Sequence, residues 1–250
     1  LAHVYERLGR YQEATQIYLR AIAIWDSKVG AQHPDFATSL LNLASVYADE
    51  DRFDEAEALY QRSLAIRQAV FGPNHASVGT VLNNLASIYE AQGRIEELQA
   101  FSLRALNIAN KTLGPDHPDT AKILRKLGVA FDGKGRFDNA QEMFQKALDI
   151  YVKEFGPDNR FLATVLINQA HAFDQQGKYK EADQALRKAL AVNQKWRGAN
   201  HPDVARVLNE LAALHLDRDP AAALQFSRKA AAAVLSHASF GEGSNLRRSG

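Results

Sequence analysis

The sequence predicts an all-α protein built as a solenoid of antiparallel helix pairs. Three observations support this prediction: a repeat with a period of 42 residues, two amphipathic helical patterns in each unit, and a glycine turn between units. The period is marked by five residues at successive steps of 42, namely His33, His75, His117, Asn159 and His201. A fixed period of this size is typical of architectures in which each unit packs against its neighbours.

Two apolar faces alternate within each unit. In the unit that begins at His33, the first face follows helical spacing and consists of Leu40, Leu43, Ala44 and Tyr47. After a break at Asp51 and Arg52, the second face consists of Ala56, Leu59, Tyr60, Ser63, Leu64 and Val70. A turn such as Gly114-Pro115 then ends the second helix, because glycine suits the left-handed residue and proline prevents continuation.

The triplet His117-Pro118-Asp119 is interpreted as the start of the next helix. Proline suits the first helical position, and an aspartate there faces the positive end of the helix dipole. A metal site made from the repeated histidines is excluded by distance. Ligands lie about 2 Å from a shared ion, whereas successive repeats are separated by about 8–10 Å.

The units resemble the tetratricopeptide repeat. The first-helix leucine of that repeat matches Leu1, Leu43, Leu85, Leu127 and Leu211; the small residue of its second helix matches Ala14, Ala56, Ala140 and Ala182. The 42-residue length and the strings LGPDHPDTA and LNNLA resemble kinesin light chain repeats and their bacterial relatives. This resemblance implies a right-handed superhelical solenoid whose concave groove receives extended peptides, including acidic motifs.

The resemblance also defines the expected organisation of the chain. A single solenoid over 1–242 is expected, with a partial repeat at 1–32 and repeats at 33–74, 75–116, 117–158, 159–200 and 201–242. Residues 243–250 are expected to form a polar tail, and further repeats or another domain are expected before Leu1. Leu98 stands where the family has a small residue, so Leu98→Ala is expected to have little effect on stability.

Composition limits the function classes. The chain has 250 residues, of which 46% are hydrophobic and 24% charged, with a formal net charge of +1 and no cysteine. Disulfides, thiolate metal sites and a cysteine nucleophile are excluded, and the charge gives no reason to expect nucleic acid or a membrane surface. The sequence has no apolar run long enough for a transmembrane helix, no glycine-rich phosphate-binding loop and no nucleophile motif. A cytoplasmic protein without enzyme activity, cofactor or bound metal is predicted.

The repeat register indicates a peptide-binding face on the first helices. The residues expected to contact a ligand are Asn42, Asn83, Asn84, Lys122, Arg125, Lys126, Asn168, His171, Arg206 and Asn209. A side-chain amide offers both donors and an acceptor, as a peptide backbone requires. The cations would bind carboxylates, so a protein partner with an acidic segment is predicted. For His171, a hydrogen-bonded structural role is the alternative.

Two other functions remain open from the sequence. The chain could be the sensory or regulatory arm of a larger protein with an enzymatic or signalling domain, which the full gene sequence would decide. It could also be a self-associating structural solenoid, which light scattering over a range of concentrations would detect. The oligomeric state is not specified by the sequence.

Overall fold

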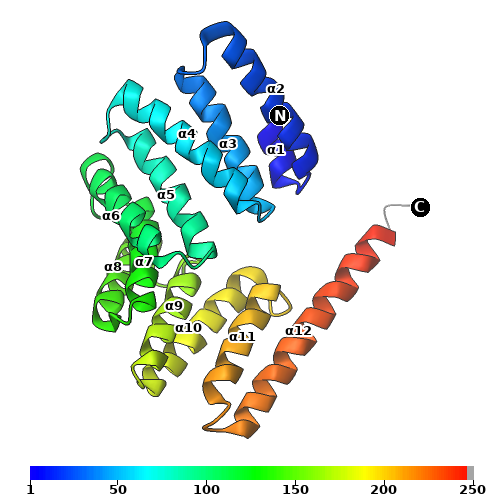
Figure 1. Cartoon of the computed structure of the whole chain (residues 1–250). Helices are drawn as coiled ribbons and strands as arrows, with labels where there is room; N and C mark the ends of the chain where they lie inside the picture. The colour runs from blue at the N-terminus through cyan, green and yellow to red at the C-terminus, as the bar shows by residue number, and fades with distance from the viewer. Residues whose placement is uncertain (247–250) are drawn as a thin grey trace. The chain divides into compact units, whose positions relative to one another are not determined.

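The described residues form twelve helices (Figure 1), which confirms the all-α prediction. In this computed structural model the backbone is described for residues 1–246, and the side chains for residues 1–28 and 30–236. The helices are α1 (Ala2–Arg7), α2 (Tyr11–Val29), α3 (Pro34–Asp49), α4 (Phe53–Phe71), α5 (Ala76–Ala91), α6 (Ile95–Thr112), α7 (Pro118–Gly133), α8 (Phe137–Phe155), α9 (Leu162–Gln175), α10 (Tyr179–Arg197), α11 (Pro202–His215) and α12 (Pro220–Leu246).

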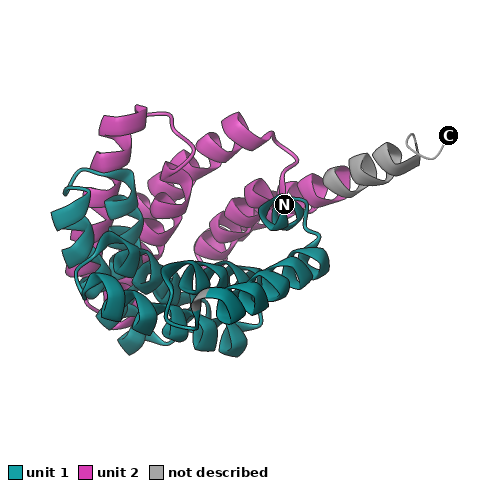
Figure 2. Cartoon of the chain, turned by 90° about the horizontal axis from the view of Figure 1, so that it is seen from above, with its two compact units in different colours: residues 1–130 teal, residues 131–250 magenta. Residues whose placement is uncertain are grey.

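The chain divides into two compact units, Leu1–Ala130 and Phe131–Gly250 (Figure 2). In unit 1, α3 packs against α4 and α5 against α6, and each pair also contacts the helix before it. In unit 2, α9 packs against α10 and α11 against α12. Helices that are neighbours in sequence are therefore neighbours in space within each unit, as expected for stacked helix pairs.

The histidines of the repeat cap the first helices. The backbone N–H of Asp35 donates to Nδ1 of His33 at 3.2 Å, and α3 begins at the intervening proline. The same hydrogen bond forms at the other three histidines, where the donors are Ser77, Asp119 and Asp203. A side-chain acceptor at this position satisfies one of the backbone donors that a helix start leaves free. The interpretation of His-Pro-Asp as a helix start is thus confirmed.

The unit at Asn159 starts differently. Asn159 is buried, and its amide donates to the carbonyl oxygens of Tyr151 at 3.0 Å and Gly156 at 2.6 Å. Its Oδ1 accepts from the backbone N–H of Phe161 at 3.0 Å. Because these hydrogen bonds hold Asn159 in a turn, α9 begins only at Leu162, whereas α5 begins directly after its histidine at Ala76.

In four of the turns that join the two helices of a pair, an arginine stacks on an aromatic ring. The backbone N–H of Arg52 donates to the carbonyl of Tyr47 at 2.8 Å, and the Arg52 guanidinium lies 3.9 Å from the centre of the Tyr47 ring. Arg52 also pairs with Glu55 in the first turn of the next helix. Equivalent stacks join Arg10 to Tyr5, Arg94 to Tyr89 and Arg136 to Phe131. These contacts help to fix the direction in which the second helix leaves each of these four turns.

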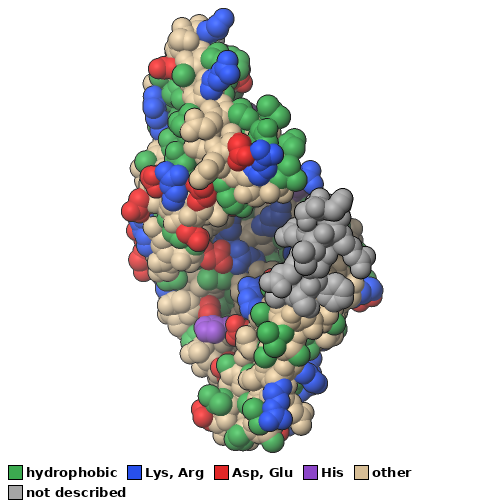
Figure 3. All heavy atoms as spheres, turned by 90° about the vertical axis from the view of Figure 1, so that its right-hand side faces the viewer, with side chains coloured by type: hydrophobic (Ala, Val, Ile, Leu, Met, Phe, Trp, Pro, Cys, Tyr) green, Lys and Arg blue, Asp and Glu red, His purple; other side chains and the backbone are tan. Residues whose placement is uncertain are grey.

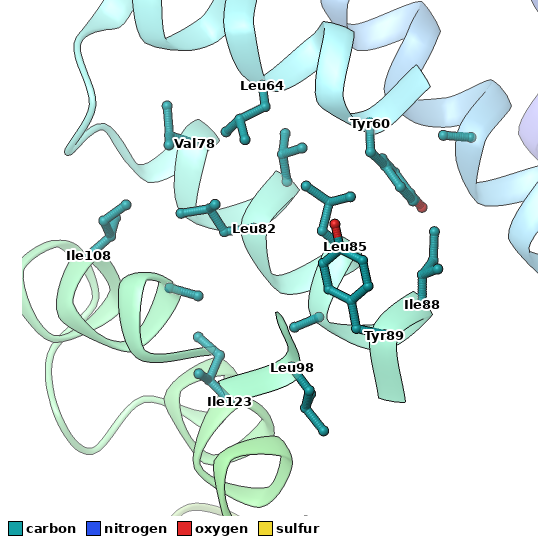
Figure 4. Close-up of a cluster of buried hydrophobic side chains, with 14 of the residues drawn as sticks. Tyr60, Leu64, Val78, Leu82, Leu85, Ile88, Tyr89, Leu98, Ile108 and Ile123 are labelled. Atoms are coloured by element: carbon teal, nitrogen blue, oxygen red, sulfur yellow. The ribbon is translucent and has the colours of Figure 1, made fainter. Parts of the chain in front are cut away.

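A hydrophobic cluster fills the interior of unit 1 between α4, α5, α6 and α7 (Figure 4). Leu98 of α6 is fully buried in it, beside residues such as Leu85 and Tyr89 of α5. This burial opposes the expectation that Leu98→Ala has little effect on stability, because the truncation would leave a cavity.

The last helix is longer than the sequence suggested. The alanine-rich stretch from Ala221 has high helix propensity, and α12 continues to Leu246, past residue 243 where the polar tail was expected to begin. Residues 247–250 of the expected tail lie outside the described residues. None of the helices in the described part of the chain combines the length and apolar character needed to cross a membrane.

Leu98→Ala should lower the free energy of unfolding by about 2–5 kcal/mol, because the truncation leaves a cavity in a packed core. Leu103→Ala, on the exposed side of the same helix, is the matched control and should have a much smaller effect. Urea unfolding followed by circular dichroism measures both. Equal losses for the two variants would contradict the packing described for α6.

Candidate functional site

Six residues predicted to contact a ligand lie on the first helices α3, α5 and α7. We call them the unit 1 face: Asn42, Asn83, Asn84, Lys122, Arg125 and Lys126. Their helices are equivalent members of successive repeats, so one face of each helix carries them. The face combines neutral amides from α3 and α5 with cations from α7.

Asn42 and Asn84 occupy equivalent repeat positions and are both half-buried. Near them, the hydroxyl of the buried Tyr60 lies 2.9 Å from Oγ of Ser45. Burial raises the pKa of Tyr60, whereas hydrogen bonds with Ser45 and Asn84 act in the opposite direction. Asn84 lines a cavity of about 380 Å³ together with Ser45 and Tyr60. The Asn84 amide thus lies in a recess formed by α3, α4 and α5, which Asp49 and Asp51 also line.

Lys126 stands at the repeat position that asparagine occupies in Asn42 and Asn84, but it is only 6% exposed. Its Nζ donates to the backbone oxygen and to Oδ1 of Asn83, both at 2.7 Å. Burial, with a smaller contribution from Arg125, lowers the pKa of Lys126 to about 7. The neutral amine retains two N–H groups, so both hydrogen bonds can persist in either state.

These contacts change what Asn83 and Lys126 offer to a ligand. Because Oδ1 of Asn83 accepts from Lys126, the Asn83 amide is left mainly as a donor. Lys126 has no exposed ammonium to present to a carboxylate in this conformation. Lys126, which was predicted to bind a ligand carboxylate, therefore orients the Asn83 amide of the unit 1 face instead.

Arg125 is held by Glu90, which lies near the end of α5. Nη1 and Nη2 of Arg125 donate to the two carboxylate oxygens of Glu90 at 2.6 and 2.9 Å. The side chains are 17% and 25% exposed, so the pair is only partly screened by water. Such a two-pronged contact is stronger and more directional than a single ion pair.

Lys122 is the exposed cation of the unit 1 face. Its Nζ lies 2.7 Å from Oδ1 of Asp119, and both side chains are 52% exposed. A surface pair of this kind contributes little to stability and opens readily. Lys122 can therefore turn toward a ligand at low energetic cost.

A second group of predicted residues lies on α9 and α11, and we call it the unit 2 face: Asn168, His171, Arg206 and Asn209. Nδ1 of His171 lies 2.6 Å from Oδ2 of the partly buried Asp132, and this hydrogen bond is the main cause of a raised His171 pKa. His171 thus forms the hydrogen bond expected for a structural histidine, and its side chain is also 61% exposed. Nδ2 of Asn168 is buried and has no hydrogen-bond partner within the described residues. Arg206 and Asn209 are exposed.

Sequence reasoning missed a column of acids that pair with basic side chains of the next repeat. Glu90, Asp132 and Asp174 lie at steps of 42 residues, and each pairs with a basic side chain of the following repeat, two on first helices and one in the turn after α11. Their partners are Arg125, His171 and Arg218 respectively. The spacing of the acids was readable from the sequence and could have revealed the column.

The surface drawn in Figure 3 carries lysine, arginine and acidic side chains interspersed, with a histidine among them. It shows no broad field of one sign on this side of the molecule, in agreement with the formal net charge of +1.

Comparison with known proteins identifies the repeat. The family model described as "Tetratricopeptide repeat" matches residues 1–69, 35–97, 77–151, 133–195 and 161–236. The chain belongs to the tetratricopeptide repeat family. Its helix pairs are thus tetratricopeptide repeats, and the solenoid fold expected from the resemblance is confirmed.

Solved structures similar to this tetratricopeptide repeat chain include kinesin light chain-like proteins. TPR-like repeats of that type from Podosopora anserina are 25% identical, with 79% of this chain and 93% of that one covered and a TM-score of 0.65. BtubC (BKLC) from P. vanneervenii is 20% identical over 94% of this chain and 92% of its own, with a TM-score of 0.66.

The apo form of RapI is 15% identical over 93% of this chain and 94% of its own, with a TM-score of 0.71. No curated protein sequence matches the chain. Tetratricopeptide repeat proteins generally act as scaffolds for protein–protein interactions, and this coarse function applies to the present chain.

The lowered pKa of Lys126 predicts a specific pH dependence of stability. Its ordinary value is 10.5 and its value in the folded protein is about 7, so the unfolded chain binds more protons between these values. The free energy of unfolding should therefore rise as pH increases from about 7 toward 10.5, and this gain in stability should be lost as pH falls back toward 7. In Lys126→Met this contribution should vanish. Urea unfolding at several pH values compares the two, and parallel pH profiles would contradict the assignment.

Proposed function

We propose that the unit 1 face binds an extended acidic segment of a partner protein. The observation that carries this proposal is the alignment of half-buried asparagine amides on α3 and α5 beside the cations Lys122 and Arg125 on α7. Amides hold a peptide backbone whatever its sequence, and cations add a preference for carboxylates. The resemblance to kinesin light chain repeats supports the same ligand class.

Each residue has a distinct role in this proposal. Asn42 and Asn84 supply both amide donors and acceptors, whereas Asn83 acts as a donor because Lys126 binds its oxygen. Lys122 contacts a ligand carboxylate directly. Arg125 offers its guanidinium fork when Glu90 is displaced. Lys126 is a positioning residue that orients Asn83.

The unit 2 face offers the same combination of groups. The exposed Asn209 suits a peptide backbone, while Arg206 and protonated His171 suit carboxylates. The buried Nδ2 of Asn168 would have to become accessible before it could donate to a ligand. Because Asp132 raises the pKa of His171, this imidazole gains its positive charge at a higher pH than an ordinary histidine. Acidic segments should therefore bind the unit 2 face more tightly as pH falls through that raised value.

The direct test removes the two ligand-facing cations of unit 1. Lys122→Gln with Arg125→Gln should weaken binding of a fluorescein-labelled oligoglutamate peptide about thirtyfold, since each partly exposed contact contributes about 1 kcal/mol and the two together about 2 kcal/mol. Binding is measured by fluorescence anisotropy at low salt, where surface charges are least screened. Lys126 is left unchanged in this variant because it is buried, and a substitution there would perturb the fold.

The matched control is Arg104→Gln with Lys111→Gln, which removes the same charge from exposed positions on α6. This control should leave affinity nearly unchanged. If both double variants lose affinity equally, the effect is one of overall charge and the unit 1 face is not the binding site.

A further inference from the structure

Glu90 occupies the guanidinium fork that an acidic ligand would need. Its two oxygens accept from the two terminal nitrogens of Arg125, which is the bidentate arrangement preferred by carboxylates in general. The partners come from successive first helices, α5 and α7, and both belong to unit 1. A carboxylate from outside must therefore displace Glu90 to obtain the same geometry.

The exposure of the pair permits such a displacement. The Glu90 side chain is 25% exposed and that of Arg125 is 17%, so a ligand can reach the pair from solvent. Lys122 lies one helical turn before Arg125 and has its own weak partner in Asp119. A ligand with several closely spaced carboxylates can engage Lys122 first and then compete with Glu90 at Arg125.

We propose that Glu90 acts as an internal competitor for acidic ligands, so that the unit 1 face selects segments with several adjacent carboxylates over segments with one. This inference rests on the proposed function of the unit 1 face. A single carboxylate exchanged for Glu90 gives no net gain in ion pairs, whereas a cluster of them offsets the loss through additional contacts. Glu90 is thus a specificity-determining residue.

A purely structural role is the competing explanation. A single-contact ion pair joins Arg94 to Glu57 at 2.7 Å, also between neighbouring helix pairs of unit 1. If Glu90 only fastens α5 to α7, its loss should lower stability without raising affinity. Glu57 is therefore the matched control, since Glu57→Gln removes the same charge from a comparable pair outside the unit 1 face.

The experiment measures oligoglutamate binding by anisotropy for wild type, Glu90→Gln, Arg125→Gln, the Glu90→Gln/Arg125→Gln double variant and Glu57→Gln. Glu90→Gln should tighten binding about fivefold, the change that corresponds to loss of a competing pair worth about 1 kcal/mol. The gain should disappear in the Arg125→Gln background. Circular dichroism confirms that each variant is folded.

A second peptide with one glutamate on a serine–glycine background tests selectivity. From wild type to Glu90→Gln, the affinity for this peptide should rise more than the affinity for oligoglutamate. The ratio of the two affinities should therefore be smaller in Glu90→Gln than in wild type.

Each outcome decides the proposal. If Glu90→Gln still raises affinity when Arg125 is absent, or if Glu57→Gln raises affinity equally, the effect is one of overall charge and the proposal for Glu90 is overturned. Wild-type binding that depends on Lys122 and Arg125 but is not tightened by Glu90→Gln overturns this inference and leaves the proposed function standing. Absence of oligoglutamate binding in every variant overturns both.

Discussion

The contact on which the rest of this protein depends is the close crossing of two helices at a small side chain. Ala14, Ala56, Ala140 and Ala182 stand at the same position of α2, α4, α8 and α10, and each has no exposed surface, whereas α6 carries the buried Leu98 there. A methyl group lets the helices of a pair approach closely, and a longer side chain at any of these four alanines would overpack the crossing. Because the hairpins of successive repeats are built alike, a step of 42 residues returns equivalent side chains to the same helix face.

This regularity connects stability to binding. The asparagines of α3 and α5 form a column only because their repeats stack in register, and the cations of α7 belong to the next position in the same series. The acids Glu90, Asp132 and Asp174 then hold cations one repeat further along. Contacts that join neighbouring repeats are thus made by the same groups that a ligand would use, so ligand affinity and repeat packing are coupled within each unit.

The helix pairs, the histidine caps and the faces of the first helices could be predicted because they follow from the period alone. The partners of individual side chains could not. A period shows which face Arg125 and Lys126 share, but a long flexible side chain reaches whichever acceptor lies nearest in the neighbouring repeat. Glu90 and Asn83 supply those acceptors here. Likewise, local hydrogen bonds of Asn159 delayed the start of α9, although the register remained intact.

The central claim is that first-helix asparagine amides receive the ligand backbone beside the cations of α7. Side-chain amide signals of a sample labelled with ¹⁵N at asparagine report on this directly during titration with oligoglutamate. The account predicts that the signals of Asn42 and Asn84 shift with saturation, while those of Asn107 and Asn110 on α6 stay in place. Shifts confined to Asn107 and Asn110, with Asn42 and Asn84 unmoved, would contradict it.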